Sequence, residues 1–412
     1  MADASAFRDD AAAAQPADGA VTVPAAIRTW IARLQLTDFR NYADLALSVG
    51  PAPVVLTGAN GSGKTNLLEA ISLLTSGQGL RRAPYPELSR LGGRPSWAVA
   101  ARVVTPMGQV SIGTGLASDG SAAAGSTRGA GRVVRIDGET QSGSGTLADH
   151  VEMIWLTPAM DGLFTGAASD RRRFLDRLIA GLDPPYCTLL GRFERAMQQR
   201  NRLLADEVRD DARFEGFERI MAETGVAVAA ARLVSVAELA AAVGARRDAA
   251  HGAFFPWAEL ALVGTLEAGL AARPAVDVED DYVRLLATTR ERDRGAGRTL
   301  DGPHRSDLVV GHGPKEMPAK VCSTGEQKAL LIGLVLAHCD LVRQRRNGAA
   351  PILLLDEIAA HLDVVRRGAL FAEILALGAQ TWMSGTDLEA FQGLQGRAQF
   401  HRTDGGRIEP SP

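Results

Sequence analysis

The run Gly58-Ala59-Asn60-Gly61-Ser62-Gly63-Lys64-Thr65 fits the phosphate-loop pattern G-x-x-x-x-G-K-[ST] at every position. An apolar stretch at 54–56 precedes it and predicts a buried strand, while 66–74 predicts a helix. Glycines let such a backbone curl tightly, so that its N–H groups point at the phosphates of a nucleotide. The start of the following helix also favours an anion. All eight residues are therefore predicted to bind a nucleotide, with Lys64 at the outer phosphates and the Thr65 hydroxyl on Mg²⁺.

The composition is that of an ordinary globular protein. With 412 residues, 46% of them hydrophobic, the chain can bury a large core in two or three lobes. No apolar run approaches the length of a membrane span, and the first residues lack the apolar core of a secretion signal, which predicts a cytoplasmic protein with no membrane partner. Cys187, Cys322 and Cys339 form no C-x-x-C pair and argue against disulfides and a zinc site. The formal net charge of −3 means that any DNA contact has to come from local basic patches.

The chain is predicted to contain two ATPase segments with a helical lobe inserted between them. Residues 1–26 are rich in Ala, Asp and Pro and predict a disordered tail. The first ATPase part, with the phosphate loop, is placed at 27–165, the helical insertion at 166–299 and the second ATPase part at 300–412. Strands are expected at 31–36, 97–105, 109–115, 132–136, 153–156 and 351–355, with 380–384 as the last core strand. A Gly/Ser/Ala run at 118–131 predicts a flexible hairpin loop.

Helical periodicity begins near residue 169. Ser169 is a natural N-cap, and one apolar face follows it, made of Phe174, Leu175, Leu178 and Ile179. Further helices are predicted at 186–205 and 214–251, and a long one within 322–346.

The second nucleotide motif is Ile352-Leu353-Leu354-Leu355-Asp356-Glu357, which has the form of a Walker B strand. A strand buried on both faces of a parallel sheet is apolar throughout. Asp356 at its end is the candidate partner of Mg²⁺, and Glu357 is the candidate that orients and polarises the attacking water. Alone such a run is weak support, but together with the phosphate loop it indicates an ATPase.

The third motif, Ser323-Thr324-Gly325-Glu326-Gln327, resembles the ABC signature. In ABC ATPases this helix start meets the γ-phosphate held by the other subunit, so Ser323, Gly325 and Glu326 are expected to act in trans. As local structure, Ser323 and Glu326 also fit a simple capping box. Asp363 follows in D-loop position. The fold class predicted is α/β, an ABC-type P-loop ATPase head of mixed and antiparallel sheets with helices, carrying an inserted helical lobe.

Several short motifs outside the general ATPase pattern point to one branch of these proteins. They are Phe39-Arg40-Asn41-Tyr42, the run from Gly61 to Ala70, Arg172-Arg173-Phe174-Leu175-Asp176, Gln199-Arg200-Asn201, the Ser323 signature and, most distinctive, Gly302-Pro303-His304-Arg305-Ser306-Asp307. The insertion is too short for the coiled coil of chromosome-maintenance ATPases and has no cysteine hook. On these motifs, from about residue 31 onward, the chain resembles the RecF family of bacterial recombination-mediator ATPases.

The resemblance implies ATP with Mg²⁺ as cofactors, ATP-dependent homodimerisation and slow hydrolysis that acts as a switch. It further implies binding to double-stranded DNA at gaps or junctions, and cooperation with RecR and RecO in loading recombinase and restarting replication. The sequence departs from the usual pattern at two places. After Thr157-Pro158 the first acidic residue is Asp161, later than is usual in the family. Ser384-Gly385-Thr386 stands where many ABC proteins carry a histidine and suggests a hydroxyl sensor.

The remaining candidates have two interpretations each. Arg40 and Asn41 are expected beside the nucleotide, or else form an ordinary turn. Arginines concentrate in the insertion and are candidates for phosphate contacts with DNA, or else form a solvated face paired with local acids; these are Arg171, Arg172, Arg173, Arg200 and Arg202. His304 and Arg305 fit a buried turn as well as a DNA or nucleotide contact. Two alternative functions are the cytosolic ATPase subunit of a membrane transporter and a scaffold in which ATP is structural.

Overall fold

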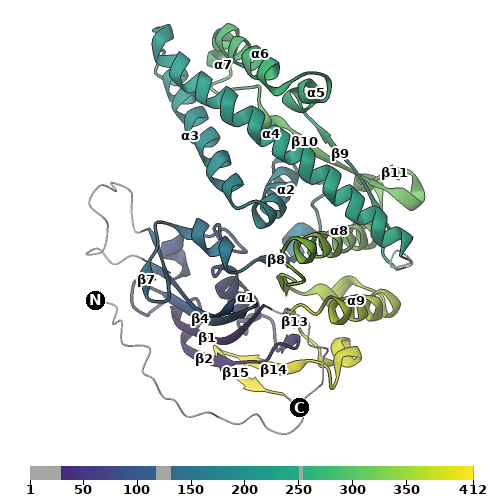
Figure 1. The fold of residues 1–412 in the computed structure, drawn as a ribbon. Coiled ribbons are helices and arrows are strands. Elements are labelled where there is room, and N and C mark those ends of the chain that lie inside the picture. Colours follow the sequence, from purple (N-terminus) through teal and green to yellow (C-terminus); the bar gives the residue numbers. More distant parts are fainter. Residues whose placement is uncertain (1–28, 117–130, 250–253, 412) are drawn as a thin grey trace. The chain divides into compact units, whose positions relative to one another are not determined.

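The computed structural model describes residues 29–116, 131–249 and 254–411 (Figure 1). The tail predicted at 1–26 and nearly all of the loop predicted at 118–131 lie outside these residues. The chain divides into two compact units. The first contains the chain up to Leu156 together with Arg346–Pro412, and the second is Thr157–Arg345.

A six-stranded mixed sheet forms the centre of the first unit. Its strand order is β15-β14-β3-β13-β12-β8, and all neighbours are parallel except β14 and β15. Every residue of the four consecutive strands β3, β13, β12 and β8 is buried, as is typical of strands in a covered parallel sheet. The strands are β3 Val54–Thr57, β8 Met153–Leu156, β12 Ile352–Leu355, β13 Thr381–Gly385, β14 Gln399–Asp404 and β15 Arg407–Pro410.

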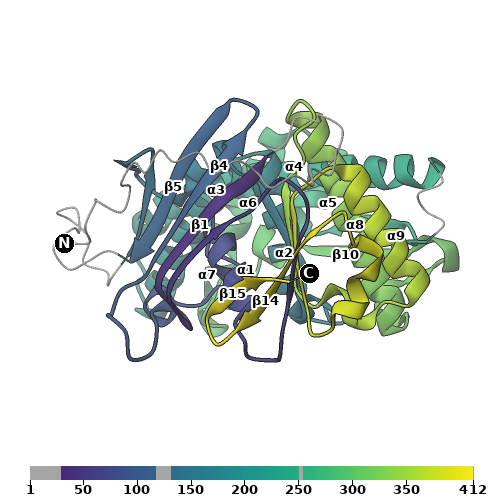
Figure 2. The ribbon, with the colours of Figure 1, turned by 90° about the horizontal axis from the view of Figure 1, so that it is seen from below.

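The other sheet of the first unit is antiparallel, in the order β2-β1-β4-β5-β6-β7. Its long strands β1, β4 and β5 lie side by side in Figure 2. The hairpin between β1 and β2 turns at Arg40-Asn41, because Phe39 pairs with Tyr42. Its strands are β1 Trp30–Phe39, β2 Tyr42–Ser48, β4 Ala98–Thr105, β5 Gly108–Leu116, β6 Arg132–Ile136 and β7 Glu139–Thr140. The unit also contains helices α1 Lys64–Ser72 and α9 Val364–Leu377.

The second unit is mainly helical. Figure 1 shows α3 running along α4, and α6 packs on α4 as well. A core of buried residues from these helices includes Phe193, Met221, Val226 and Tyr282. A small sheet, β11-β10-β9, completes the unit. The elements are α2 Ala168–Leu182, α3 Pro185–Ala205, α4 Asp211–Asp248, β9 Ala258–Val263, α5 Thr265–Ala272, α6 Ala275–Thr288, α7 Arg290–Gly295, β10 Asp307–His312, β11 Met317–Pro318 and α8 Thr324–Arg345.

Judged by length and composition alone, the apolar helix α4 could cross a membrane. No membrane span is predicted from the sequence, so this property of α4 differs from the expectation. It nevertheless packs against α3, α6, α8 and β9. Its residues Glu218 and Arg232 are buried in ion pairs. These contacts are those of the core helix of a globular unit.

Two local predictions are wrong. Ser169 is not an N-cap, because α2 already begins at Ala168 and Ala167 holds the extended cap position. The strand predicted at 380–384 forms as β13, but it is not the last core strand, since β14 pairs with β3 on the other side. The boundaries predicted at 165/166 and 299/300 separate the ATPase parts from the insertion on the basis of sequence motifs. The two compact units divide the chain by packing instead, so these boundaries stay a prediction.

Arg200 on α3 is completely buried. Its guanidinium pairs with Glu218 at 3.0 Å and Asp293 at 2.7 Å. It also donates to the Thr299 hydroxyl at 2.8 Å and the Leu286 carbonyl at 2.7 Å. A guanidinium with no exposed surface cannot reach a DNA phosphate, so the prediction that Arg200 contacts DNA is corrected: its role is to join α3, α4, α6 and α7.

We expect Arg200→Met to lower the free energy of unfolding by about 3 kcal/mol, because it leaves two buried carboxylates with fewer donors. Urea denaturation followed by circular dichroism measures this change. Arg202→Met is the matched control, since Arg202 is exposed on the same helix and its loss should cost less than about 0.5 kcal/mol. Equal stabilities of the two variants would contradict the structural role of Arg200.

Candidate functional site

The phosphate loop joins β3 to α1 and depends on glycine at two positions. Gly58 has φ 144° and Gly63 has φ 113°, conformations that favour glycine. A Cβ at Gly58 would lie 2.4 Å from the Thr403 carbonyl oxygen, and one at Gly63 would lie 2.4 Å from Nδ2 of Asn41. Thr403 and Asn41 therefore pack closely against the loop, while Ala59, Asn60 and Gly61 are exposed to solvent.

Lys64 turns back over the loop that precedes it. Its Nζ donates to the carbonyl oxygens of Gly58 at 2.7 Å and Ala59 at 2.9 Å. Burial lowers the pKa of this ammonium, and the carboxylates of Glu357 and Asp356 offset part of that shift. The cation is thus held against two carbonyl oxygens of the loop, and its contact with the outer phosphates stays a prediction.

The ends of three adjacent parallel strands bring Thr65, Asp356 and Ser384 together. Asp356 Oδ1 accepts from the Thr65 hydroxyl at 3.0 Å and from the Ser384 hydroxyl at 2.6 Å. The donor set fits Mg²⁺, which prefers oxygen ligands and uses one or two protein groups together with phosphates and water. Among residues 29–116, 131–249 and 254–411, no cluster of three or more His, Cys, Asp or Glu suggests a different metal site.

Glu357 lies in a strained position directly after β12. Its φ of 50° is in the left-handed region, which a residue with a side chain rarely adopts. Its backbone N–H donates to the Ser384 hydroxyl at 2.9 Å, which holds this conformation. Ser384 therefore links both acidic residues of the predicted Walker B motif.

The β1–β2 turn supports the phosphate loop from one side. Tyr42 is fully buried and its hydroxyl donates to the Gly63 carbonyl at 3.0 Å, while Asn41 Nδ2 donates to the Ser62 carbonyl at 3.2 Å. Arg40 binds the buried Glu69 on α1 with two hydrogen bonds of 2.8 and 2.9 Å. In the structure both Arg40 and Asn41 bind protein atoms, and their predicted contact with the nucleotide stays a prediction.

Three residues that support this site were not singled out from the sequence. Tyr42 stands in a quoted family motif but had no assigned role, and Glu69 lies in the helix after the loop. Thr403 comes from β14, and its hydroxyl shares a 2.7 Å hydrogen bond with that of Ser62. No local pattern marks Thr403, because only the pairing of β14 with β3 brings it to the loop.

The signature residues lie in the second unit, at the start of α8. The Ser323 N–H donates to Glu326 Oε2 at 3.1 Å, and the Glu326 N–H donates to the Ser323 hydroxyl at 3.4 Å, which is the geometry of a capping box. Lys315 Nζ lies 2.6 Å from Glu326 Oε1. The lysine, followed by the Ser323 N–H, lowers the pKa of Glu326 to about 2. In the first unit, the D-loop candidate Asp363 caps α9 through a 2.8 Å bond from the Arg366 N–H.

The distinctive motif from Gly302 to Asp307 is a structural turn of the second unit. Asp307 accepts two hydrogen bonds of 2.7 and 2.8 Å from Arg171, and Arg172 donates to the Ser306 carbonyl. His304 shares a 3.1 Å hydrogen bond with the Thr299 carbonyl, and burial lowers the pKa of His304 to about 4, so that its ring is neutral near pH 7. Arg171 and Arg172 thus bind the motif itself, whereas Arg173 and Arg202 are exposed.

We expect Tyr42→Phe to weaken nucleotide binding about fivefold, because one buried hydrogen bond that holds the Gly63 carbonyl is lost. Fluorescence titration with a labelled ATP analogue measures the affinity. Tyr282→Phe is the matched control, since it removes a hydroxyl that donates to the Asp301 carbonyl at 2.8 Å in the second unit. If Tyr42→Phe bound nucleotide as tightly as this control, the support role of Tyr42 would be wrong.

Comparisons with known proteins agree on one family. A family described as RecF/RecN/SMC N terminal domain matches residues 30–384. Three relatives bear the name DNA replication and repair protein RecF. That of Mesorhizobium japonicum is 54% identical over 384 residues, covering 93% of this chain and 98% of the relative. Those of Brucella suis and Rhizobium johnstonii are each 50% identical, covering 92% of this chain and 96% and 98% of the relatives.

Two solved structures show the same fold. The recombination mediator protein RecF-ATP of the RecFOR pathway has a TM-score of 0.80 at 20% identity, covering 94% of this chain and 99% of that chain. An Smc head bound to the winged-helix domain of ScpA has a TM-score of 0.52 at 14% identity, covering 93% and 97%. The predicted ABC-type α/β ATPase head is thereby confirmed. Because the family match spans most of the chain and the relatives are similar over nearly their whole length, the chain belongs to the RecF family of DNA replication and repair proteins.

Proposed function

We propose that this chain is an ATP-dependent DNA-binding protein of recombinational repair and replication restart. The observation that carries the proposal is the contact of Thr65 and Ser384 with Asp356 at the mouth of the phosphate loop, in a chain that belongs to the RecF family. This arrangement fits a nucleoside triphosphate with Mg²⁺. A relative's name, DNA replication and repair protein RecF, supplies the process in which the nucleotide acts.

In the proposed site, the loop from Gly58 to Thr65 surrounds the phosphates and Lys64 releases its two carbonyl partners to bind the outer ones. Thr65 and Asp356 would hold Mg²⁺, which would lower the charge repulsion that opposes attack on the γ-phosphate. Glu357 orients the attacking water. Arg40 and Asn41 approach the nucleotide from the β1–β2 turn.

Hydrolysis is proposed to be slow and to serve as the release step of a switch. Ser384 lies near the end of β13, in the stretch where a hydroxyl sensor is predicted, and its hydroxyl is already shared between Asp356 and the Glu357 N–H. A neutral hydroxyl is a weaker proton acceptor than imidazole and assists proton transfer less. The chain is therefore proposed to be a weak ATPase.

ATP is proposed to join two copies head to head. The phosphates bound by one copy meet Ser323, Gly325 and Glu326 of the other, and Asp363 lies in the D-loop of the same interface. The exposed Ser323 side chain supports this role. The dimer clamps double-stranded DNA near gaps or junctions, and RecR and the RecO pathway are the proposed partners, because the similar solved structure is described as part of the RecFOR pathway.

The transporter alternative is not favoured, since the relatives named above are DNA replication and repair proteins. The protein is also proposed to be cytoplasmic and to have no membrane partner. The division of the chain into ATPase parts at 27–165 and 300–412 around an insertion at 166–299 is also proposed on the motifs alone.

We expect Lys64→Ala to abolish ATP-dependent dimerisation, because the charge on the outer phosphates is no longer balanced. Ser323→Arg should block dimerisation while leaving ATP binding intact, since the added bulk lies on the face that meets the partner. Analytical ultracentrifugation with and without ATP measures the first effect, and labelled-ATP titration separates the two variants. A dimer of the Lys64→Ala variant in ATP would show that nucleotide does not control assembly.

We expect DNA affinity to fall steeply with salt, with each removed phosphate contact lowering the slope of log affinity against log salt by about one. Arg173→Ala and Arg202→Ala should each lower this slope with ATP present. Arg407→Ala is the control, because it removes the same exposed charge from β15 in the first unit. Fluorescence anisotropy with a gapped duplex at several salt concentrations measures the slopes; unchanged slopes in both variants would rule these arginines out as the DNA surface.

A further inference from the structure

The signature motif contains a feature that opposes its proposed role. Glu326 is a carboxylate three residues after Ser323, at a helix start that is proposed to approach a triphosphate. Its low pKa of about 2 keeps it ionised at every physiological pH. Two anions brought together repel each other, and across an interface such repulsion reduces affinity. The charge of Glu326 therefore has to be offset for a dimer to close.

Lys315 supplies the opposite charge at close range. Its ammonium lies 2.6 Å from Glu326 Oε1, while the other carboxylate oxygen, Oε2, accepts the Ser323 N–H at 3.1 Å. Both carboxylate oxygens are thus engaged within the chain. The pair makes the motif locally neutral and turns the acidic group toward its own helix start.

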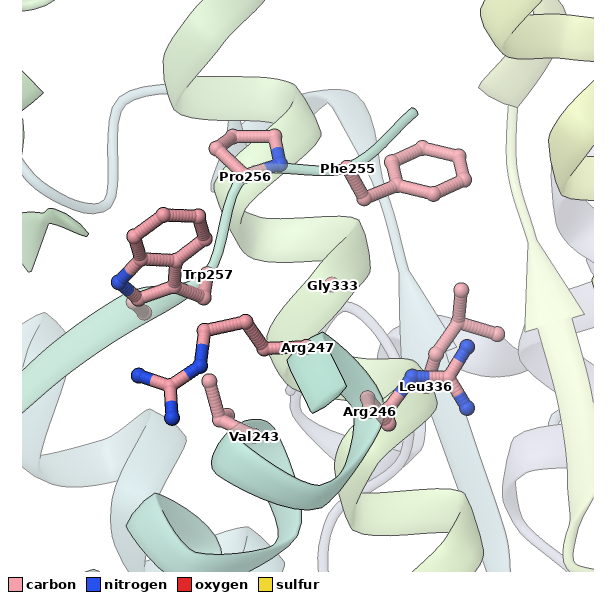
Figure 3. A pocket seen from close by; sticks show the side chains of 9 residues that line it. Val243, Arg246, Arg247, Phe255, Pro256, Trp257, Gly333 and Leu336 are labelled. Carbon is pink, nitrogen blue, oxygen red and sulfur yellow. The ribbon is translucent and has the colours of Figure 1, made fainter. Parts of the chain in front are cut away.

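The segment that carries Lys315 is fixed in place by an aromatic contact. Gly313 donates its N–H to the Trp257 carbonyl at 3.0 Å, and a Cβ at Gly313 would lie 1.8 Å from Nε1 of the Trp257 ring. Arg247 in turn lies over that ring, 5.8 Å from its centroid (Figure 3). The short turn Gly313–Lys315 is therefore packed under an indole, and it presents Lys315 to α8 from a defined position.

We propose that Lys315 is a positioning residue of the ATP site completed in trans: it holds Glu326 in the capping box and cancels its charge, so that the signature can approach the triphosphate of a second copy. This inference rests on the proposed ATP-dependent dimer. Lys315 itself does not have to contact the nucleotide. Its role is to remove a repulsion that the carboxylate of Glu326 would otherwise create.

The test compares dimerisation constants of four variants in a slowly hydrolysed ATP analogue, measured by analytical ultracentrifugation. Lys315→Met should weaken the dimer about tenfold or more, because a two-fold dimer contains the uncompensated charge twice. Glu326→Gln removes the charge, while glutamine still completes a capping box, and this variant sets the reference for the double variant. Lys315→Met/Glu326→Gln should dimerise as well as Glu326→Gln alone and better than Lys315→Met, and Lys320→Met, which removes an exposed charge from the same segment, should have little effect.

Two further readouts separate this role from a structural one. The defect of Lys315→Met should shrink as salt is raised from 50 to 500 mM, because salt screens repulsion between exposed charges, at a screening length of about 4–14 Å over that range. ATP affinity of the monomer should stay unchanged. Lack of recovery in the double variant, or a defect that does not depend on salt, would overturn the inference.

The outcome for wild type distinguishes this inference from the proposal beneath it. If wild type stayed monomeric with the analogue, the proposed dimer would be wrong and the inference with it. If wild type formed a dimer that Ser323→Arg prevents, but Lys315→Met dimerised equally well, only the role of Lys315 would be overturned.

Discussion

The proposed nucleotide site depends on the order of three neighbouring strands. Because β13 lies between β3 and β12 and all three are parallel, their carboxyl ends meet at one edge of the sheet. Thr65, Ser384 and Asp356 come from segments far apart in the chain, and only this order brings both hydroxyls within 3.0 Å of one carboxylate oxygen. If two of these strands exchanged places in the sheet, each motif would keep its local sequence, but the side chains of Thr65, Ser384 and Asp356 would no longer meet.

The sequence could predict these candidate residues because the motifs require particular residue types. Local backbone geometry requires glycine at positions 58 and 63, and the chemistry of phosphate and metal requires a lysine and an aspartate, here Lys64 and Asp356. Such requirements produce short sequence patterns. Thr403 and Tyr42 could not be assigned in this way. Thr403 reaches the loop only because β14 pairs with β3, and this long-range pairing leaves no mark in a local pattern. Tyr42 stands in a quoted motif, but its contact with the Gly63 carbonyl depends on how the β1–β2 turn packs against the loop.

Charge was the least informative feature of the sequence. Arginines concentrate along α2 and α3, and this pattern suggested a basic surface. In the fold, Arg200 has no exposed surface and joins four helices, and Arg171 has its guanidinium on Asp307. A buried guanidinium offers five donors in a fixed plane and suits the joining of several helices. The position of an arginine in the sequence does not show whether it joins buried helices or contacts DNA, because both roles use the same residue at similar spacing.

The same consideration explains the distinctive motif from Gly302 to Asp307. Gly302 has φ 131°, and a Cβ there would lie 2.1 Å from the Tyr282 hydroxyl, so no other residue fits. Pro303, Ser306 and Asp307 then receive hydrogen bonds from arginines of α2 and α4. A distinctive motif can therefore have a structural role, because it fixes how helices meet. In this protein the Gly302–Asp307 motif organises the helical unit, whereas the general ATPase motifs form the proposed nucleotide site.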